Sequence, residues 1–182
     1  MTTNQDEAST VADHAPRDLA EFRRLFDAEF GYVCRTLRRL GVSAGDLEDV
    51  AQDLFVTLHR NFADYDPKRP LRPWLFSFAL RFAANYRRLS RTHGHTGDDS
   101  LARIPAPERA GDDARDLVLR ALGELEFDPR ILIVMHDVEG FDAPEISSQL
   151  GIPLNTVYSR LRVAREAFRS AIKKLQSSGD MP

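Results

Sequence analysis

Hydrophobic residues recur at helical spacing along most of the chain. In the first half they predict three helices, over residues 17–40, from residue 43 to a loop that begins at Phe62, and over residues 71–89. Gly41 ends the first helix, and a break near Gly31 is an alternative to one continuous helix. The Pro-rich stretch before the third helix predicts a loop.

The second half has the same helical spacing. Asp113 caps one predicted helix, Asp128 and Pro129 open another, and residues 141–168 are typical of a helix-turn-helix. Between the halves, residues rich in Gly, Pro, Asp and Ser lack an apolar period. The predicted fold class is therefore all-α, with two small helical domains joined by a flexible linker, the C-terminal one containing the helix-turn-helix. The boundaries are a disordered tail at 1–16, domains at 17–91 and 114–178, and a linker at 92–113.

Local signals define the helix-turn-helix. Asp142 is a suitable N-cap, Glu145 follows at the spacing of a capping box, and Pro144 falls in the first turn, where its missing N–H costs little. Gly151 supplies the turn between the two helices. The longer second helix then carries an apolar stripe of Val157, Leu161, Ala164 and Phe168.

The other faces of that longer helix are polar and basic. They carry Tyr158, Ser159, Arg160, Arg162, Arg165 and Arg169. A helix that enters the DNA major groove needs an apolar face that fixes its angle and another face of hydrogen-bond donors and cations. A solvated amphipathic helix in an ordinary bundle is the alternative, but it leaves the capped short helix, the glycine turn and four arginines unexplained.

The net charge of −3 conceals two basic blocks. Residues 67–91 hold seven Lys or Arg and no acid, and residues 153–176 hold six against one acid. By contrast, residues 92–152 carry thirteen acids against five bases, and residues 44–66 carry six against one. Two basic blocks in an acidic frame predict two separate nucleic-acid contacts, with the acidic faces left for another partner.

The predicted helix at 71–89 combines aromatic and basic residues. Five aromatics lie between Trp74 and Tyr86, and bases can stack on such rings while arginines follow the phosphates of a single strand. Aromatics at helical spacing are more often core, so we interpret Phe78, Phe82 and Trp74 as packing residues. Another face of the helix carries Ser77, Arg81, Asn85 and Arg88.

The predicted second helix has an acidic face. Asp49, Gln52 and Asp53 lie together there, opposite an almost unbroken apolar stripe. Spacing alone favours a solvated surface as the interpretation of this face.

Three motifs in this order resemble one protein family. EISSQLGIPLNTVYSRLRVAREAF resembles the promoter-reading C-terminal segment of bacterial sigma factors, specifically the extracytoplasmic-function (ECF) group of the sigma-70 family. DLEDVAQDLFVTLHRNF resembles the segment that grips the clamp helices of the polymerase largest subunit, and LRPWLFSFALRFAANYRR resembles the melting and −10-reading helix. The chain departs from the usual pattern at Leu80 and Arg81, at Asn85, at Asn155, Tyr158 and Val163, and with Asp53 in place of Glu.

The resemblance implies a role for each motif. It implies that the chain binds core RNA polymerase, through the clamp helices and the flap, and promoter DNA, and it allows for an anti-sigma factor. Implied polymerase-binding residues are Asp49, Gln52, Asp53 and Phe55. The loop before the third helix would pocket a flipped base, and implied −10 residues are Trp74, Arg81, Asn85, Arg87 and Arg88. Implied −35 residues are Asn155, Thr156, Tyr158, Ser159, Arg160, Arg162 and Arg165.

Other classes of function have less support. No phosphate-binding Gly loop, nucleophile elbow or metal cluster is present in the sequence, so we expect neither catalysis nor a cofactor. His93 and His95 could suggest a metal site, but no cysteine lies near them to complete it. Cys34 is the single cysteine of the sequence, so no disulfide can form within one chain. The sequence lacks a signal peptide and a membrane span, so we expect a cytoplasmic protein. Two rival functions are a helix-turn-helix regulator that acts without polymerase and a catalytic domain with an accessory DNA-binding module.

Overall fold

The computed structural model describes residues 15–62, 65–66, 68–92 and 112–179. Most of the predicted tail and linker, with His93 and His95, lies outside the described residues. Within them every regular element is helical, which confirms the all-α fold class. The elements are α1 (Ala15–Arg39), α2 (Leu47–Arg60), α3 (Leu71–Thr92), α4 (Asp112–Gly123), α5 (Phe127–Ile133), the π-helix η2 (Val134–Val138), α6 (Ala143–Leu150) and α7 (Leu154–Gly179).

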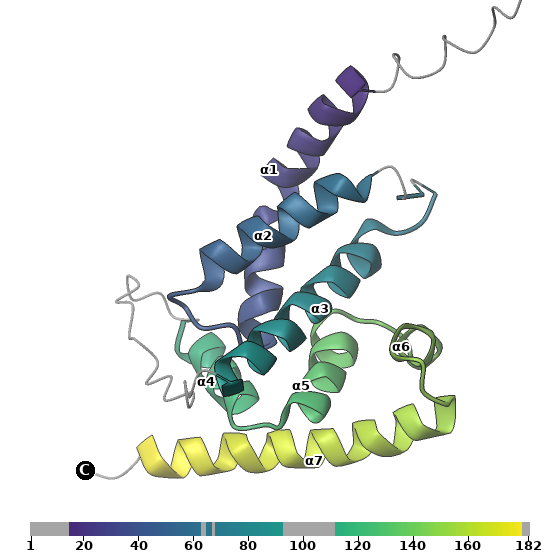
Figure 1. Cartoon of the computed structure of the whole chain (residues 1–182). Coiled ribbons are helices and arrows are strands. Elements are labelled where there is room, and N and C mark those ends of the chain that lie inside the picture. Colours follow the sequence, from purple (N-terminus) through teal and green to yellow (C-terminus); the bar gives the residue numbers. More distant parts are fainter. Residues whose placement is uncertain (1–14, 63–64, 67, 93–111, 180–182) are drawn as a thin grey trace, which may run out of the picture.

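The first three helices form one bundle in which α1 packs on α2 and α3 (Figure 1). Leu37, Leu54 and Leu75 come from the three helices in turn and are completely buried. The break considered near Gly31 is wrong, because α1 runs through it without interruption. A glycine inside a helix costs only about 1 kcal/mol relative to alanine, and the adjoining Tyr32 and Val33 are buried in the core, which holds the helix together.

The last helices form the second group, with α7 packed against α4, α5 and α6. Figure 1 shows α7 running along the base of this group. Its buried residues Val157, Leu161 and Ala164 are three of the four positions of the predicted stripe, and Phe168 is partly buried against the same core. Helix α5 continues directly into the π-helix η2. At the end of η2, Glu139 N–H donates to Val134 O and Phe141 N–H donates to Met135 O, both at 2.9 Å.

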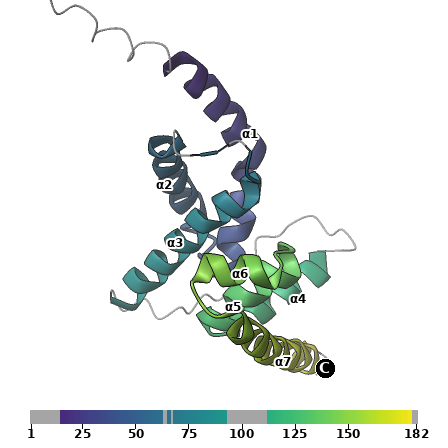
Figure 2. The same ribbon diagram turned by 90° about the vertical axis from the view of Figure 1, so that its right-hand side faces the viewer.

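The two groups are in contact, which the sequence did not predict. In both views α1–α3 lie on one side and α4–α7 on the other, and α3 reaches the second group (Figures 1 and 2). Contacts join α1 to α4, and buried side chains of both groups belong to one continuous hydrophobic core.

Candidate functional surfaces

The helix-turn-helix is built by the capping and turn residues that the sequence indicated. Asp142 Oδ1 accepts from Glu145 N–H at 2.8 Å, and Glu145 Oε2 accepts from Asp142 N–H at 2.8 Å, which completes the capping box. Gly151 has φ 65° and ψ 30°, in the left-handed region, and ends α6. Ser147 Oγ then donates to Ile152 O at 2.6 Å across the turn. These bonds set the angle at which α7 leaves the turn.

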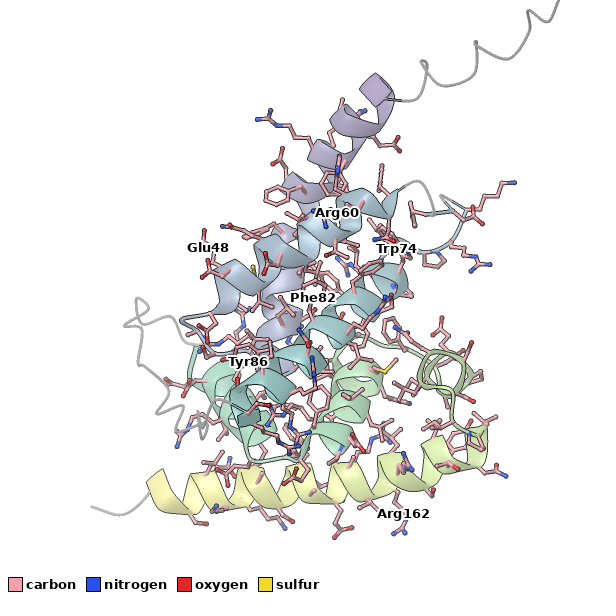
Figure 3. The ribbon with its side chains drawn as sticks, in the orientation of Figure 1. Glu48, Arg60, Trp74, Phe82, Tyr86 and Arg162 are labelled. Carbon is pink, nitrogen blue, oxygen red and sulfur yellow. The ribbon has the colours of Figure 1, made fainter. Side chains whose placement is uncertain are left out.

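The early turns of α7 present polar side chains to solvent. Tyr158 is 56% exposed, and Figure 3 shows Arg162 pointing away from the body of the molecule. Asn155, Ser159, Arg160 and Arg162 are also exposed, whereas Thr156 is half-buried. Since the buried stripe of α7 faces α4–α6, this exposed face is the one available to a DNA groove.

Arg165 differs from the other α7 arginines because the protein itself engages its guanidinium. Its Nε donates to Asp137 Oδ2 at 3.0 Å, Nη2 contacts Asp137 Oδ1, and Nη2 lies 3.1 Å from His136 Nδ1. The hydrogen bond from Arg165 holds the pKa of Asp137 below its usual range. Both partners lie on η2, so the π-turn brings them to α7.

The acidic face of α2 is exposed as expected, with Asp49, Gln52 and Asp53 all directed to solvent. Phe55 is different: it is 3% exposed and packs on Phe26 with ring centroids 4.7 Å apart. Next to this face lies an open hollow of about 410 Å³. It is lined by Phe22, Phe26, Gln52, Phe55, Val56, His59 and Arg60. Phe55 therefore lines the hollow but is almost completely buried, unlike Asp49, Gln52 and Asp53.

On α3 the predicted DNA residues fall into three environments. Arg81, Asn85 and Arg88 are exposed, with Arg88 Nη2 donating to Asn85 Oδ1 at 2.9 Å. Trp74 is half-buried between the rings of Tyr65 (4.8 Å) and Phe78, so the packing interpretation is confirmed for it. Arg87 is turned toward the second group, where it pairs with Glu126 at 3.1 Å.

Sequence reasoning missed several residues between the two groups. Phe76 is completely buried, and its ring lies 5.3 Å from that of Phe141 in a T-shaped arrangement. Arg39 pairs with Glu139 at 3.1 Å. The available signal was a second set of apolar positions on α3, at Phe76, Ala79 and Ala83, in addition to the packing residues Phe78 and Phe82 that the sequence indicated. One bundle does not need two apolar faces on the same helix, so the second face indicates another packing partner.

Comparisons with known proteins identify the family of the chain. The family model for sigma-70 region 2 matches residues 25–92, and that for sigma-70 region 4 matches residues 115–168. The RNA polymerase sigma factor CnrH of Cupriavidus metallidurans is 31% identical over 73% of this chain and 76% of its own length. The ECF RNA polymerase sigma factor SigL of Mycobacterium tuberculosis is 30% identical over 91% of this chain and 96% of its own. The chain belongs to the ECF sigma factors of the sigma-70 family. As such it directs RNA polymerase to initiate transcription at promoters.

Solved structures of sigma factors share the fold. This sigma factor superimposes with a TM-score of 0.62 on CnrH in complex with the cytosolic domain of CnrY, at 26% identity over 86% of this chain and 90% of that one. It superimposes with a TM-score of 0.69 on RpoE in complex with the anti-sigma factor NepR from Bartonella quintana, at 21% identity over 84% and 97% of the two chains. Among the described residues, no helix is long and apolar enough to cross a membrane.

Proposed function

We propose that this sigma factor divides its work among three exposed faces. The α2 face of Asp49, Gln52 and Asp53 binds the clamp helices of the polymerase. The α3 face of Arg81, Asn85 and Arg88 engages the −10 region as it melts, and the early turns of α7 read the −35 element. It does no covalent chemistry, and it works where the polymerase is, in the cytoplasm.

The observation that carries this proposal is the separation of the three faces by charge. The acidic α2 face is unsuited to a nucleic acid, because phosphates would be repelled, but it suits a protein partner with basic side chains. The α3 and α7 faces carry exposed arginines, which bind phosphates and base edges. One chain with both kinds of face can connect a polymerase to DNA. Neither a regulator that acts without polymerase nor a catalytic domain with a DNA-binding module requires this combination.

A protein that regulates this sigma factor is a further proposed partner. CnrH, which is similar in sequence and in fold, was solved with the cytosolic domain of CnrY. We expect an anti-sigma factor to bind this chain in a comparable way and to compete with the polymerase.

The test is co-elution with core polymerase. Asp49→Lys with Asp53→Lys should abolish the complex, because reversing two exposed charges repels a basic partner while leaving the fold intact. The matched control is Asp113→Lys with Asp116→Lys on α4, which makes the same charge change on exposed residues far from the proposed face in sequence. Co-elution of the α2 variant at the wild-type level would refute the clamp-facing assignment.

A further inference from the structure

The guanidinium of Arg165 is held along one edge by η2. Its Nε donates to Asp137 Oδ2 at 3.0 Å and its Nη2 donates to Asp137 Oδ1, so the carboxylate accepts from two donors of the same edge. Nη2 also lies 3.1 Å from His136 Nδ1, which accepts there because a guanidinium has only donors. This two-bond geometry fixes the plane of the guanidinium as well as its position.

The other edge of the same guanidinium remains available to a partner outside the chain. Nη1 carries two more N–H donors, and no side chain or carbonyl in the described ranges accepts from it. The Arg165 side chain is 40% exposed even though it is paired. An arginine presents five donors in a rigid fork, so one edge can bind Asp137 while the other binds an oxygen of DNA.

The position of Arg165 on α7 favours a phosphate as that oxygen. At about 100° per residue, Arg165 lies about 40° around the helix from Leu161, whereas Ser159 lies about 160° from it. Leu161 is buried, so Arg165 stands at the flank of the helix and Ser159 on its outermost face. A side chain at the flank of a helix in the major groove lies closer to the sugar–phosphate backbone than to the base edges.

The carboxylate that holds Arg165 is itself held in place. Asp137 belongs to η2, in which Val134 and Met135 are completely buried. Phe141 N–H closes the end of η2 by donating to Met135 O at 2.9 Å. A group that positions another must be fixed by packing and hydrogen bonds of its own, and Asp137 meets that requirement.

The pair also changes what this arginine contributes to DNA binding. No ion pair within the described residues involves the other three α7 arginines, Arg160, Arg162 and Arg169. Such arginines attract any duplex, because phosphates are alike in every sequence. The Asp137 carboxylate offsets the charge of Arg165, so its non-specific attraction is weaker. A directional bond from Nη1 remains, and a bond of this kind sets the register of a protein on the duplex.

From these contacts we infer that Asp137 is a positioning residue for promoter recognition. It holds Arg165 so that Nη1 meets one phosphate of the −35 element, and the reading side chains of α7 then meet their bases in that register. Without the carboxylate, Arg165 is free to attract phosphates in any register. The inference deepens the proposed reading of the −35 element by α7 and rests on it.

The test compares the binding of two duplexes by holoenzyme assembled from core polymerase and the full chain. One duplex is selected by wild-type holoenzyme from a random pool, and in the other only the selected upstream block is scrambled. Asp137→Asn should weaken the preference for the selected duplex about three- to tenfold, because a freed Arg165 no longer fixes the register. The same variant should bind the scrambled duplex more tightly at low salt, since a negative charge is lost.

Three other variants separate positioning from charge. Arg165→Ala should weaken the preference by a similar factor, and adding Asp137→Asn to it should weaken it no further, because the two residues act as one unit. Arg165→Lys keeps the charge but not the rigid fork, so it should lose the preference as alanine does. Glu166→Gln is the matched control: it removes one exposed negative charge next to Arg165 in sequence and should strengthen binding to both duplexes without changing their ratio.

Stability is controlled by measuring binding below the temperature at which any variant begins to unfold, as monitored by circular dichroism. An unchanged preference in Asp137→Asn would overturn the inference, because the pair would then be structural only. A stronger preference would overturn it too, since Asp137 would then withhold Arg165 from DNA. So would an equal loss in Glu166→Gln, or a further loss in the double variant.

These outcomes are distinct from a failure of the proposed function. If wild-type holoenzyme binds both duplexes equally, α7 does not read the upstream block, and the inference fails with the proposed function. If wild type discriminates between the duplexes and the variants give any of the contrary results, only the positioning role of Asp137 is refuted.

Discussion

Replacing Gly151 with alanine tests the turn that aims α7. Gly151 has φ 65°, where a Cβ costs about 1–2 kcal/mol. Alanine also restricts the unfolded chain, which stabilises the folded state by about 0.4–1 kcal/mol, so the net destabilisation should be about 1 kcal/mol. For a chain of this size, about 1 kcal/mol lowers Tm by roughly 2–4 °C.

Gly123→Ala provides the matched control for this experiment. Gly123 is helical, without a positive φ, and an added Cβ would meet no atom within 4 Å. Alanine there should stabilise by about 0.5–1 kcal/mol, because it removes freedom from the unfolded chain only. Thermal melts should therefore place Gly123→Ala above wild type and Gly151→Ala below it. The strain assigned to the turn is refuted if the two variants melt together.

Two other predictions concern the DNA-facing helices. Arg81→Ala with Asn85→Ala should lower transcription from duplex promoters more than from templates with a pre-melted bubble, because residues that capture separated strands offset the cost of opening; equal losses would indicate general backbone contact instead. The ion pair that lowers the pKa of Asp137 stabilises the fold above the unfolded pKa of about 3.9, and this contribution should be lost progressively as pH falls from there through the lower folded-state pKa. Urea titrations should therefore show Asp137→Asn less stable than wild type at pH 7, with a difference that shrinks steadily as pH is lowered into the acid range, whereas a difference that is the same at every pH would mean that the ion pair with Arg165 contributes nothing.

The helix-turn-helix was predictable because all its signals are local. The capping box joins Asp142 and Glu145, three positions apart, and the left-handed turn needs a glycine at position 151. The stripe of α7 needs only helical spacing. The residues that specify these features are close together in the sequence, so no knowledge of tertiary contacts was needed to predict them.

The contact between the two groups was not predictable in the same way. Arg39 and Glu139 are 100 positions apart, and Gly41 and Arg130, which also meet there, come from opposite halves of the chain. Neither pair has a spacing that marks it. At Gly31 a local signal was misleading instead. Glycine weakly disfavours a helix, but the buried residues that follow it, Tyr32 and Val33, keep α1 continuous.

The candidate site shows the same division. The exposed faces of α2, α3 and α7 follow from helical periodicity, and the structure presents Asp49, Gln52 and Arg162 to solvent as expected. Phe55 belongs to the apolar stripe that periodicity predicts for α2, and it is buried accordingly, although the resemblance implies a polymerase contact for it. The ion pair of Arg165 depends on Asp137 of η2, and no spacing in the sequence indicates it.

Sequencing the 5′ ends of RNA made on fragmented bacterial DNA tests the central claim most directly. Core polymerase is compared alone, with wild type, with Arg162→Ala and with Arg169→Ala. Wild type should add new start sites that share an upstream sequence block. Arg162→Ala should relax the base preference within that block, because a bidentate arginine–guanine contact is worth about 1–3 kcal/mol of discrimination. Arg169 lies farther along α7, where we expect it to contact a DNA phosphate. Arg169→Ala should therefore lower all new starts by a similar factor and reduce the salt dependence of DNA binding by about one unit of slope. If wild type adds no start sites, or if Arg169→Ala alone shifts the preferred bases, the proposed reading of promoters by α7 is contradicted.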